Sequence, residues 1–288
     1  NKKDQEIFPL SGISKKETIM SNENGYLAKY FSDRFGFNNP DNVWDLKEID
    51  FVLIGDSFTH GMSVLDKDTI RGNIENKTGK GVISLGYSGN GPLIELATLK
   101  EYLPLTNSKR VIWIYYEEND LQDLIRELTS PILKNYLENK NFSQNLPFKQ
   151  EEIDNKLINV LHAAIIAENN FQFKKLINFI KLKRFRNLFF DRATQIEVEI
   201  PKQFIEIISD VKEIASKKNI NFYFVYLPEK NRYIKELRKN KDFRQYEKIK
   251  KIINDLEIPM IDLKLEFQEK FENPLSLYNK SHAHLNPS

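Results

Sequence analysis

Short apolar runs alternate with longer segments of helical periodicity along most of the chain. Five runs are rich in β-branched and aromatic residues and have the length of buried strands; they cover residues 50–54, 82–85, 111–116, 222–227 and 259–263. Most segments between them repeat their apolar positions with helical spacing, at residues 66–73, 93–102, 205–217 and 246–256. Strands that alternate with helices in this way form parallel sheets whose two faces are both covered.

This alternation predicts an α/β fold, a three-layer α/β/α sandwich around a mostly parallel five-stranded sheet with flavodoxin-like strand order. Two parts of the chain stand outside the pattern. Residues 1–48 mix aromatic residues with turn formers, and we expect an irregular N-terminal arm packed on the domain. Residues 49–288 are expected to form one domain with a helical insertion at about 121–200, which includes helices over 123–137 and 151–167.

Composition narrows the classes of function. The 43 basic and 41 acidic residues nearly cancel, so no overall positive field favours a nucleic-acid partner. Cysteine is absent, which excludes disulfides, thiolate zinc sites and a cysteine nucleophile. No two histidines and an acid have metal-ligand spacing, and we therefore expect neither a metal nor another cofactor.

The compartment stays open at this stage. No apolar run reaches the length of a transmembrane helix, and no signal peptide is visible. The chain begins with Asn1 rather than Met, which leaves room for an upstream targeting or anchoring segment that has been removed.

The first predicted strand ends in a polar turn that carries a serine. Gly55 interrupts the apolar run, and Asp56 and Ser57 follow it. In open α/β sheets, ligands bind where strands end and helices begin. A serine there can act as a nucleophile beside backbone N–H groups, or it can simply cap the next helix, and the local pattern favours neither role.

The next two strands also end in small or polar residues. The second runs into residues 86–92, where three glycines indicate a sharp turn or a close approach of the backbone. This segment lacks the Gly-Lys-Ser/Thr ending of a phosphate loop. The third strand ends in Glu117, Glu118, Asn119 and Asp120. Parallel strands bring all three endings to one edge of the sheet.

Four short motifs, in order along the chain, resemble the conserved blocks of the SGNH (GDSL) hydrolase superfamily. They are Gly-Asp-Ser-Phe at 55–58, Ser-Gly-Asn at 88–90, Asn-Asp at 119–120 and His-Leu-Asn-Pro at 284–287. The resemblance implies that Ser57 is the nucleophile and His284 the base, with His282 as a rival base. It further implies an oxyanion hole formed by the Ser57 and Gly89 N–H groups and the Asn119 amide.

Two positions depart from the family pattern. Glu117 stands where the third block usually begins with glycine, and Ser281 stands where the family places an aspartate three residues before the histidine. That acid normally fixes the imidazole tautomer. We therefore expect a Ser57–His284 dyad, with Ser281 or a backbone carbonyl accepting the imidazole N–H; Asp262, after the last strand, is a weaker candidate for the acid.

Further residues are candidates for lining a pocket at this edge: Asp56, His60, His282 and Arg232. Arg232 follows the fourth strand and can hold a substrate carboxylate or a sugar hydroxyl, although a surface position is the simpler interpretation. His60 has an equally simple alternative, local hydrogen bonding in the first turn of a helix.

Residues 171–192 combine many basic residues with a large apolar content. Such a segment can lie on an anionic membrane or contact a partner. The alternative that we favour is a lid packed on the domain, with its lysines solvated.

Together these features predict a serine-dependent acyl ester hydrolase acting on a small acyl ester or an acetylated carbohydrate. The alternatives are a carbohydrate O-acetyltransferase of the cell envelope and a catalytically weak protein that binds through the same pocket. The motifs look most like those of bacterial cell-envelope members that modify polysaccharides, so the resemblance favours a periplasmic or envelope location.

Overall fold

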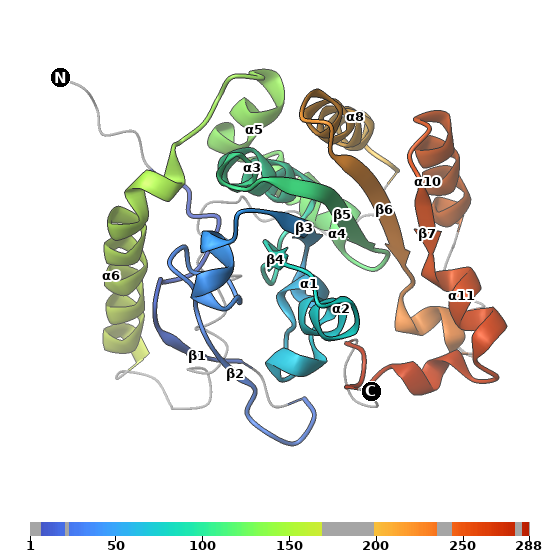
Figure 1. Ribbon diagram of the computed structural model, residues 1–288, viewed down its shortest axis with the longest axis horizontal. Helices are drawn as coiled ribbons and strands as arrows, with labels where there is room; N and C mark the ends of the chain where they lie inside the picture. The colour runs from blue at the N-terminus through green and yellow to red at the C-terminus, as the bar shows by residue number, and fades with distance from the viewer. Residues whose placement is uncertain (1–6, 21–22, 169–198, 235–243, 280–283, 288) are drawn as a thin grey trace.

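The computed structural model describes residues 7–20, 23–168, 199–234, 244–279 and 284–287. At its centre is a five-stranded sheet in which all neighbouring strands are parallel (Figure 1). The order across the sheet is β4 (Val82–Ser84), β3 (Ile49–Gly55), β5 (Ser108–Tyr116), β6 (Asn221–Leu227) and β7 (Met260–Asp262). This is the flavodoxin-like order, and both the predicted fold class and the five predicted strands are confirmed.

Side chains of the central strands alternate between two apolar clusters, one on each face of the sheet. In β5, Val111, Trp113 and Tyr115 belong to the larger cluster, whereas Ile114 and Tyr116 belong to the smaller one. This alternation follows from the two-residue period of a strand. Because both faces are apolar, the run reads as continuously hydrophobic in the sequence.

Helices cover both faces of the sheet (Figure 1). The larger cluster includes side chains of α3 (Pro92–Tyr102), α8 (Lys202–Lys217) and α10 (Arg244–Asp255). The smaller cluster is covered by α1 (Ser57–His60), α2 (Ile70–Thr78) and α11 (Leu263–Lys270). Leu285, near the C-terminal end of the chain, packs against this smaller cluster, so the tail completes the layer on that face.

The N-terminal arm is more regular than the sequence predicts. It contains a two-stranded antiparallel sheet of β1 (Glu17–Ile19) and β2 (Lys29–Phe31). Its side chains Phe8, Leu10 and Phe37 are buried in the same core as the main sheet. The arm is thus packed on the sheet's core, and the expectation of an irregular segment is wrong for these two strands.

The segment after β5 forms α4 (Asp120–Glu127), α5 (Pro131–Glu138) and α6 (Gln150–Glu168). A single helix over 123–137 is therefore wrong. The Ser130 side chain accepts a hydrogen bond from Leu133 N–H, and Pro131 occupies the first turn, so a new helix starts there. The helix predicted at 151–167 is confirmed as α6. The basic segment 171–192 lies outside the described residues.

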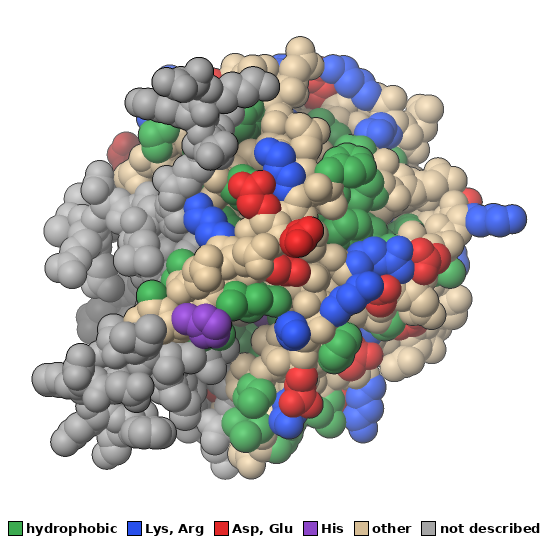
Figure 2. Space-filling view, turned by 90° about the vertical axis from the view of Figure 1, so that its left-hand side faces the viewer, with side chains coloured by type: hydrophobic (Ala, Val, Ile, Leu, Met, Phe, Trp, Pro, Cys, Tyr) green, Lys and Arg blue, Asp and Glu red, His purple; other side chains and the backbone are tan. Residues whose placement is uncertain are grey.

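Short 3-10 helices fill several connections: η1 (Asp41–Asp45), η2 (Asp66–Asp68), η3 (Leu103–Leu105), η4 (Leu146–Lys149), η6 (Lys230–Tyr233) and η7 (Pro274–Leu277). None of the helices in the described ranges is long and apolar enough to cross a membrane. The face that carries α6 shows basic side chains interspersed with acidic ones (Figure 2). This mixture agrees with the small net charge of +2.

Candidate active site

The turn between β3 and α1 places Ser57 at the carboxyl edge of the sheet. Gly55 has a φ of +154°, and a Cβ at this position would lie 2.2 Å from Thr59 Oγ1 and 2.8 Å from the Ile114 carbonyl oxygen. Only glycine fits so close an approach. Asp56 then caps α1, since its carboxylate accepts the Phe58 N–H at 3.0 Å. Asp56, rather than Ser57, therefore has the capping role.

Ser57 lies at one end of a chain of hydrogen bonds that joins three distant parts of the sequence. His284 Nε2 is 2.8 Å from Ser57 Oγ, and His284 Nδ1 is 2.7 Å from a carboxylate oxygen of Glu23. The Glu23 and His284 side chains are 9% and 16% exposed. Ser57 comes from the β3–α1 turn, His284 from the C-terminal tail, and Glu23 from the connection between β1 and β2.

The partners of the imidazole define its tautomer. An ionised carboxylate can only accept hydrogen bonds, so Nδ1 carries the hydrogen and donates it to Glu23. Nε2 then has a free lone pair toward the hydroxyl of Ser57. Ser57 Oγ also lies 3.2 Å from Asp56 Oδ2, and its single hydrogen can serve only one of these acceptors. The shorter contact to His284 is the one that can activate the hydroxyl.

Asparagine side chains tie the arm to the tail around this chain. Asn279 Nδ2 donates to the Glu23 carbonyl oxygen at 2.8 Å and to Asn24 Oδ1 at 2.7 Å. The backbone N–H of Asn279 donates to the His284 carbonyl oxygen at 2.8 Å. Asn24 in turn donates to the Ser63 carbonyl oxygen at 2.8 Å. Glu23 and His284 are therefore positioned by a shared network of hydrogen bonds.

The imidazole is also held by packing. Its ring lies against the Phe58 ring, with a centroid separation of 4.9 Å. The next residue, Leu285, forms a bridge with Tyr278, whose hydroxyl donates to the Pro228 carbonyl oxygen at 2.6 Å. Pro228 directly follows β6, so the tail is anchored to a strand end. These contacts restrict the rotation of His284 away from Ser57.

The three predicted oxyanion donors lie at the ends of neighbouring strands. Gly89 has a left-handed φ of +82°, and no described residue accepts a hydrogen bond from its N–H. The Asn119 amide donates to Asp123 at 2.6 Å, and because an amide nitrogen has two hydrogens, one remains for a ligand. The Ser57 N–H faces the Asp56 carboxylate. Gly89 and Asn119 are thus the donors that the resting protein leaves available.

His60 supports the loop that carries Gly89. Its ring is buried and stacks on Tyr87 at a centroid separation of 4.4 Å. Its Nδ1 lies 3.1 Å from Ser88 Oγ, and its Nε2 lies 3.1 Å from the hydroxyl of Tyr30. Tyr30 belongs to β2, so His60 links the arm to the second motif loop and does not line the cavity described below.

Arg232 is paired with Glu117, which corrects its assignment as a pocket residue. Arg232 Nε donates to Glu117 Oε2 at 2.9 Å, and its Nη2 contacts the other carboxylate oxygen. The Glu229 N–H also donates to Glu117, at 3.0 Å. Both charged side chains are less than a tenth exposed. The buried charge of Glu117 is therefore neutralised by this arginine, which is not available for a substrate carboxylate.

Several acidic side chains are buried behind Ser57. Burial raises the pKa values of Asp56, Glu95 and Asp120, and the mutual repulsion of their negative charges adds to the effect for Glu95 and Asp120. Glu127 has a defined structural role, since it accepts the Gly91 N–H at 2.5 Å and the Leu93 N–H at 2.8 Å at the start of α3. Within the described ranges, no three His, Asp or Glu side chains form a metal-binding group.

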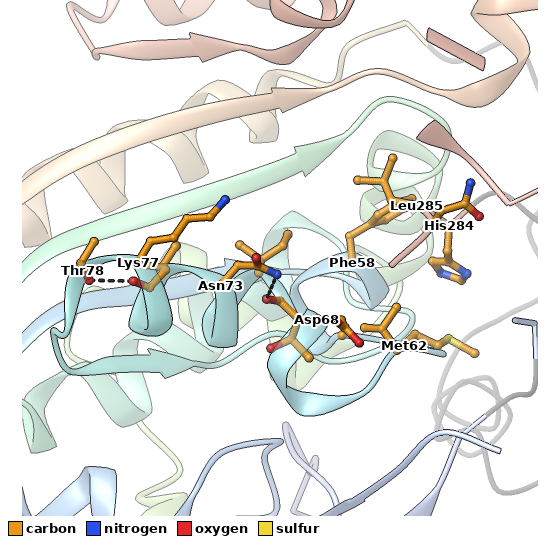
Figure 3. Close-up of a pocket in the computed structure, with 14 residues that line it drawn as sticks. Phe58, Met62, Asp68, Asn73, Lys77, Thr78, His284 and Leu285 are labelled. Carbon is orange, nitrogen blue, oxygen red and sulfur yellow. Dashed lines mark hydrogen bonds between the residues drawn. The ribbon is translucent and has the colours of Figure 1, made fainter. Parts of the chain in front are cut away.

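A cavity of about 460 Å³ opens beside His284 (Figure 3). It lies between α1, α2 and the C-terminal tail. Its lining includes the apolar side chains of Phe58, Met62, Ile70, Ile74 and Leu285. The hydrogen-bonded residues Glu23, His284 and Ser57 therefore lie beside a cavity large enough for part of a small-molecule substrate.

No family model matches the chain, and no curated protein sequence matches it. Solved structures with a similar fold include a GDSL-like lipase from Bacteroides thetaiotaomicron, which is 15% identical with a TM-score of 0.39; the match covers 83% of this chain and 81% of the lipase. A protein assigned as an acylhydrolase from Bacteroides fragilis is also 15% identical with a TM-score of 0.39, over 84% and 85% of the two chains. At this level of similarity the assignment of the site rests on its geometry.

Sequence reasoning missed Glu23, the carboxylate that contacts His284. The candidate Asp262 has other partners, because its carboxylate accepts the Tyr246 hydroxyl at 2.5 Å and caps α11. Ser281 and the rival base His282 lie outside the described residues. Glu23 occurs in a polar, turn-forming stretch with no recognisable motif. The sequence shows only that Glu23 is an acidic residue in the N-terminal arm, and several other acidic residues of the arm share that property.

Proposed function

We propose that this protein is a serine-dependent acyl ester hydrolase that uses a Ser57–His284–Glu23 triad. The observation that carries the proposal is the unbroken chain of hydrogen bonds from the Glu23 carboxylate through the imidazole to Ser57 Oγ. A serine hydroxyl becomes a useful nucleophile when an adjacent imidazole accepts its proton, and the imidazole works best when a carboxylate fixes its tautomer.

In the first half of the reaction, Ser57 Oγ attacks the ester carbonyl carbon, and its proton moves to His284 Nε2. Negative charge develops on the former carbonyl oxygen, which the Gly89 N–H and the Asn119 amide stabilise. Each such donor contributes about 3 kcal/mol in the transition state. The imidazolium then gives its proton to the leaving alkoxide, the C–O bond breaks, and an acyl-serine remains.

In the second half, a water molecule takes the place of the departed alcohol. His284 accepts a proton from this water as the water oxygen attacks the acyl carbon. The imidazolium then returns a proton to Ser57 Oγ as the bond between Oγ and the acyl carbon breaks and the carboxylic acid product leaves. Glu23 stays ionised throughout and stabilises the imidazolium in both halves. Because its charge is partly buried, the stabilisation is larger than between exposed groups.

Acyl transfer is the second candidate, because the cavity beside His284 can hold an alcohol where hydrolysis uses water. An alcohol there would be deprotonated by the same imidazole and would accept the acyl group. A carbohydrate O-acetyltransferase belongs to this class. The readout that separates the two is whether an added oligosaccharide diverts acetyl groups from water to sugar.

The proposal is tested by hydrolysis of 4-nitrophenyl acetate and by labelling with a fluorophosphonate. We expect Ser57→Ala to lose both activities and His284→Ala to lose most turnover, while Ser209→Ala on the exposed side of α8 keeps both. Absence of turnover and of labelling in the wild-type protein contradicts the enzymatic proposal. It would favour a protein that binds its ligand through the same cavity without turnover.

A further inference from the structure

The cavity beside His284 is elongated along one helix. His284 and Leu285 lie at one end, and Lys77 and Thr78 lie at the other (Figure 3). The wall between them is formed by α2, along which Ile70 and Lys77 are separated by about 10 Å at 1.5 Å per residue. A ligand that fills the cavity therefore extends from the catalytic imidazole to the last turn of α2.

The position of the cavity relative to the reacting groups decides which half of an ester it accepts. His284 lines the cavity, whereas the oxyanion donors Gly89 and Asn119 are not among its lining residues. In acyl transfer the carbonyl oxygen turns toward the oxyanion donors, and the leaving oxygen turns toward the imidazole that protonates it. The group beside the imidazole is therefore the alcohol rather than the acyl chain.

We propose that this cavity binds the alcohol moiety of the ester, and that this alcohol carries an anionic group at the end remote from the reacting oxygen. The inference rests on the proposed serine esterase activity and adds the substrate class. Apolar side chains line the part of the cavity next to His284, so the alcohol has an apolar or ring-shaped body there.

The far end of the cavity carries a positive charge, whereas the part closer to His284 carries a negative one. Lys77 is exposed at the far end, and no carboxylate of a described residue lies within 4.0 Å of its Nζ, so its charge is available to a ligand. Asp68 lines the cavity closer to Met62 and the catalytic end (Figure 3). Its carboxylate disfavours an anion in the middle of the cavity and accepts hydrogen bonds from hydroxyls. The anionic group of the ligand, a carboxylate or a phosphate, therefore belongs at the Lys77 end.

The charge at the far end is tested with two esters of equal length, 6-acetoxyhexanoate and its neutral amide, 6-acetoxyhexanamide. We expect wild-type kcat/KM to be about two- to five-fold higher for the anionic ester, the range of a solvent-exposed ion pair. Lys77→Gln should bring the ratio to one, and added salt should lower it. Lys80→Gln, which removes an equal charge outside the cavity, should keep the wild-type ratio. Equal ratios in wild type and Lys77→Gln overturn the assignment of the anion.

The assignment of the alcohol side is tested by narrowing the cavity with Ile74→Trp. We expect the ratio of kcat/KM for hexyl acetate over methyl acetate to fall about ten-fold or more, because the long alcohol loses its space. The ratio for methyl hexanoate over methyl acetate should fall much less. A larger fall in the second ratio means that the cavity holds the acyl chain, which overturns this proposal but leaves the esterase intact. Absence of Ser57-dependent turnover of every ester refutes the proposed function itself.

Discussion

Replacing Glu23 with glutamine tests whether the arm supplies the third member of the triad. The substitution keeps the size of the side chain and its ability to contact His284 Nδ1, and it removes the negative charge. The glutamine amide can also present its NH₂ group to the ring, which would favour the tautomer with the hydrogen on Nε2. That tautomer cannot accept the proton of Ser57. Both effects oppose catalysis, and neither removes the nucleophile or the base.

The size of the loss follows from the geometry. Glu23 and His284 are in hydrogen-bond contact at 2.7 Å, which puts the centres of the two charges about 4 Å apart once the imidazolium forms. At an effective dielectric constant of about 20, the attraction between them is about 4 kcal/mol. With 1.36 kcal/mol for each factor of ten in rate, we expect kcat to fall about a thousand-fold.

The measurement is Ser57-dependent hydrolysis of 4-nitrophenyl acetate over a range of pH, with far-ultraviolet circular dichroism to establish folding. Glu17→Gln is the matched control, since Glu17 lies in the same arm and its carboxylate forms an exposed ion pair with Lys29. We expect this control to retain wild-type kcat. The triad assignment is refuted when folded Glu23→Gln retains a third or more of wild-type kcat, or when both variants lose activity to the same extent.

Three further predictions concern groups around the site. Burial raises the pKa of Glu95, so the native protein loses stability as the pH rises through that raised value. Glu95→Gln should therefore gain stability over wild type between pH 4 and pH 8 in urea denaturation, by up to about 1.4 kcal/mol per pH unit. A stability advantage of the wild type that grows with pH contradicts this prediction. Arg232→Met should lower the free energy of unfolding by about 3–5 kcal/mol, because the Glu117 carboxylate is left buried without its cation. The double variant Arg232→Met/Glu117→Gln should recover part of this loss. Equal losses in the single and double variants contradict the ion-pair argument. Asn119→Ala should lower kcat about a hundred-fold with little change in KM, as loss of an oxyanion donor does, and a change confined to KM contradicts that role.

Local patterns in the sequence were enough to predict the main sheet. The clearest run is 222–227, which consists of aromatic and aliphatic residues because both faces of the sheet are covered. The alternation with helices predicts that the strands are parallel and that helices cover both faces of the sheet. The same approach failed at residues 123–137, because helical periodicity continues through Ser130 and Pro131 while capping chemistry starts a new helix there.

The same distinction between local and non-local features separates the site residues that the sequence predicts from those that it does not. Ser57, Gly89 and Asn119 lie in the segments that follow β3, β4 and β5, so their approach to one another comes with the fold. The Glu23–His284 contact joins residues 261 positions apart, and no local pattern distinguishes Glu23 from other acids of the chain. The pairing of Arg232 with Glu117 is equally non-local, and the sequence alone allowed Arg232 to be assigned to substrate.

The proposed acid, Glu23, lies on the N-terminal arm, so the proposed triad depends on a segment outside the main sheet. A catalytic triad is defined by geometry and not by order, and the same three roles occur in different orders in unrelated enzymes. In the proposed triad the order is acid, nucleophile, base, with the acid Glu23 on the arm and the base His284 on the tail. Asn279 contacts the backbone of both segments, so it couples their positions. Activity should therefore depend on how the arm docks, and a change that loosens the arm should lower kcat even when Ser57 and His284 are intact.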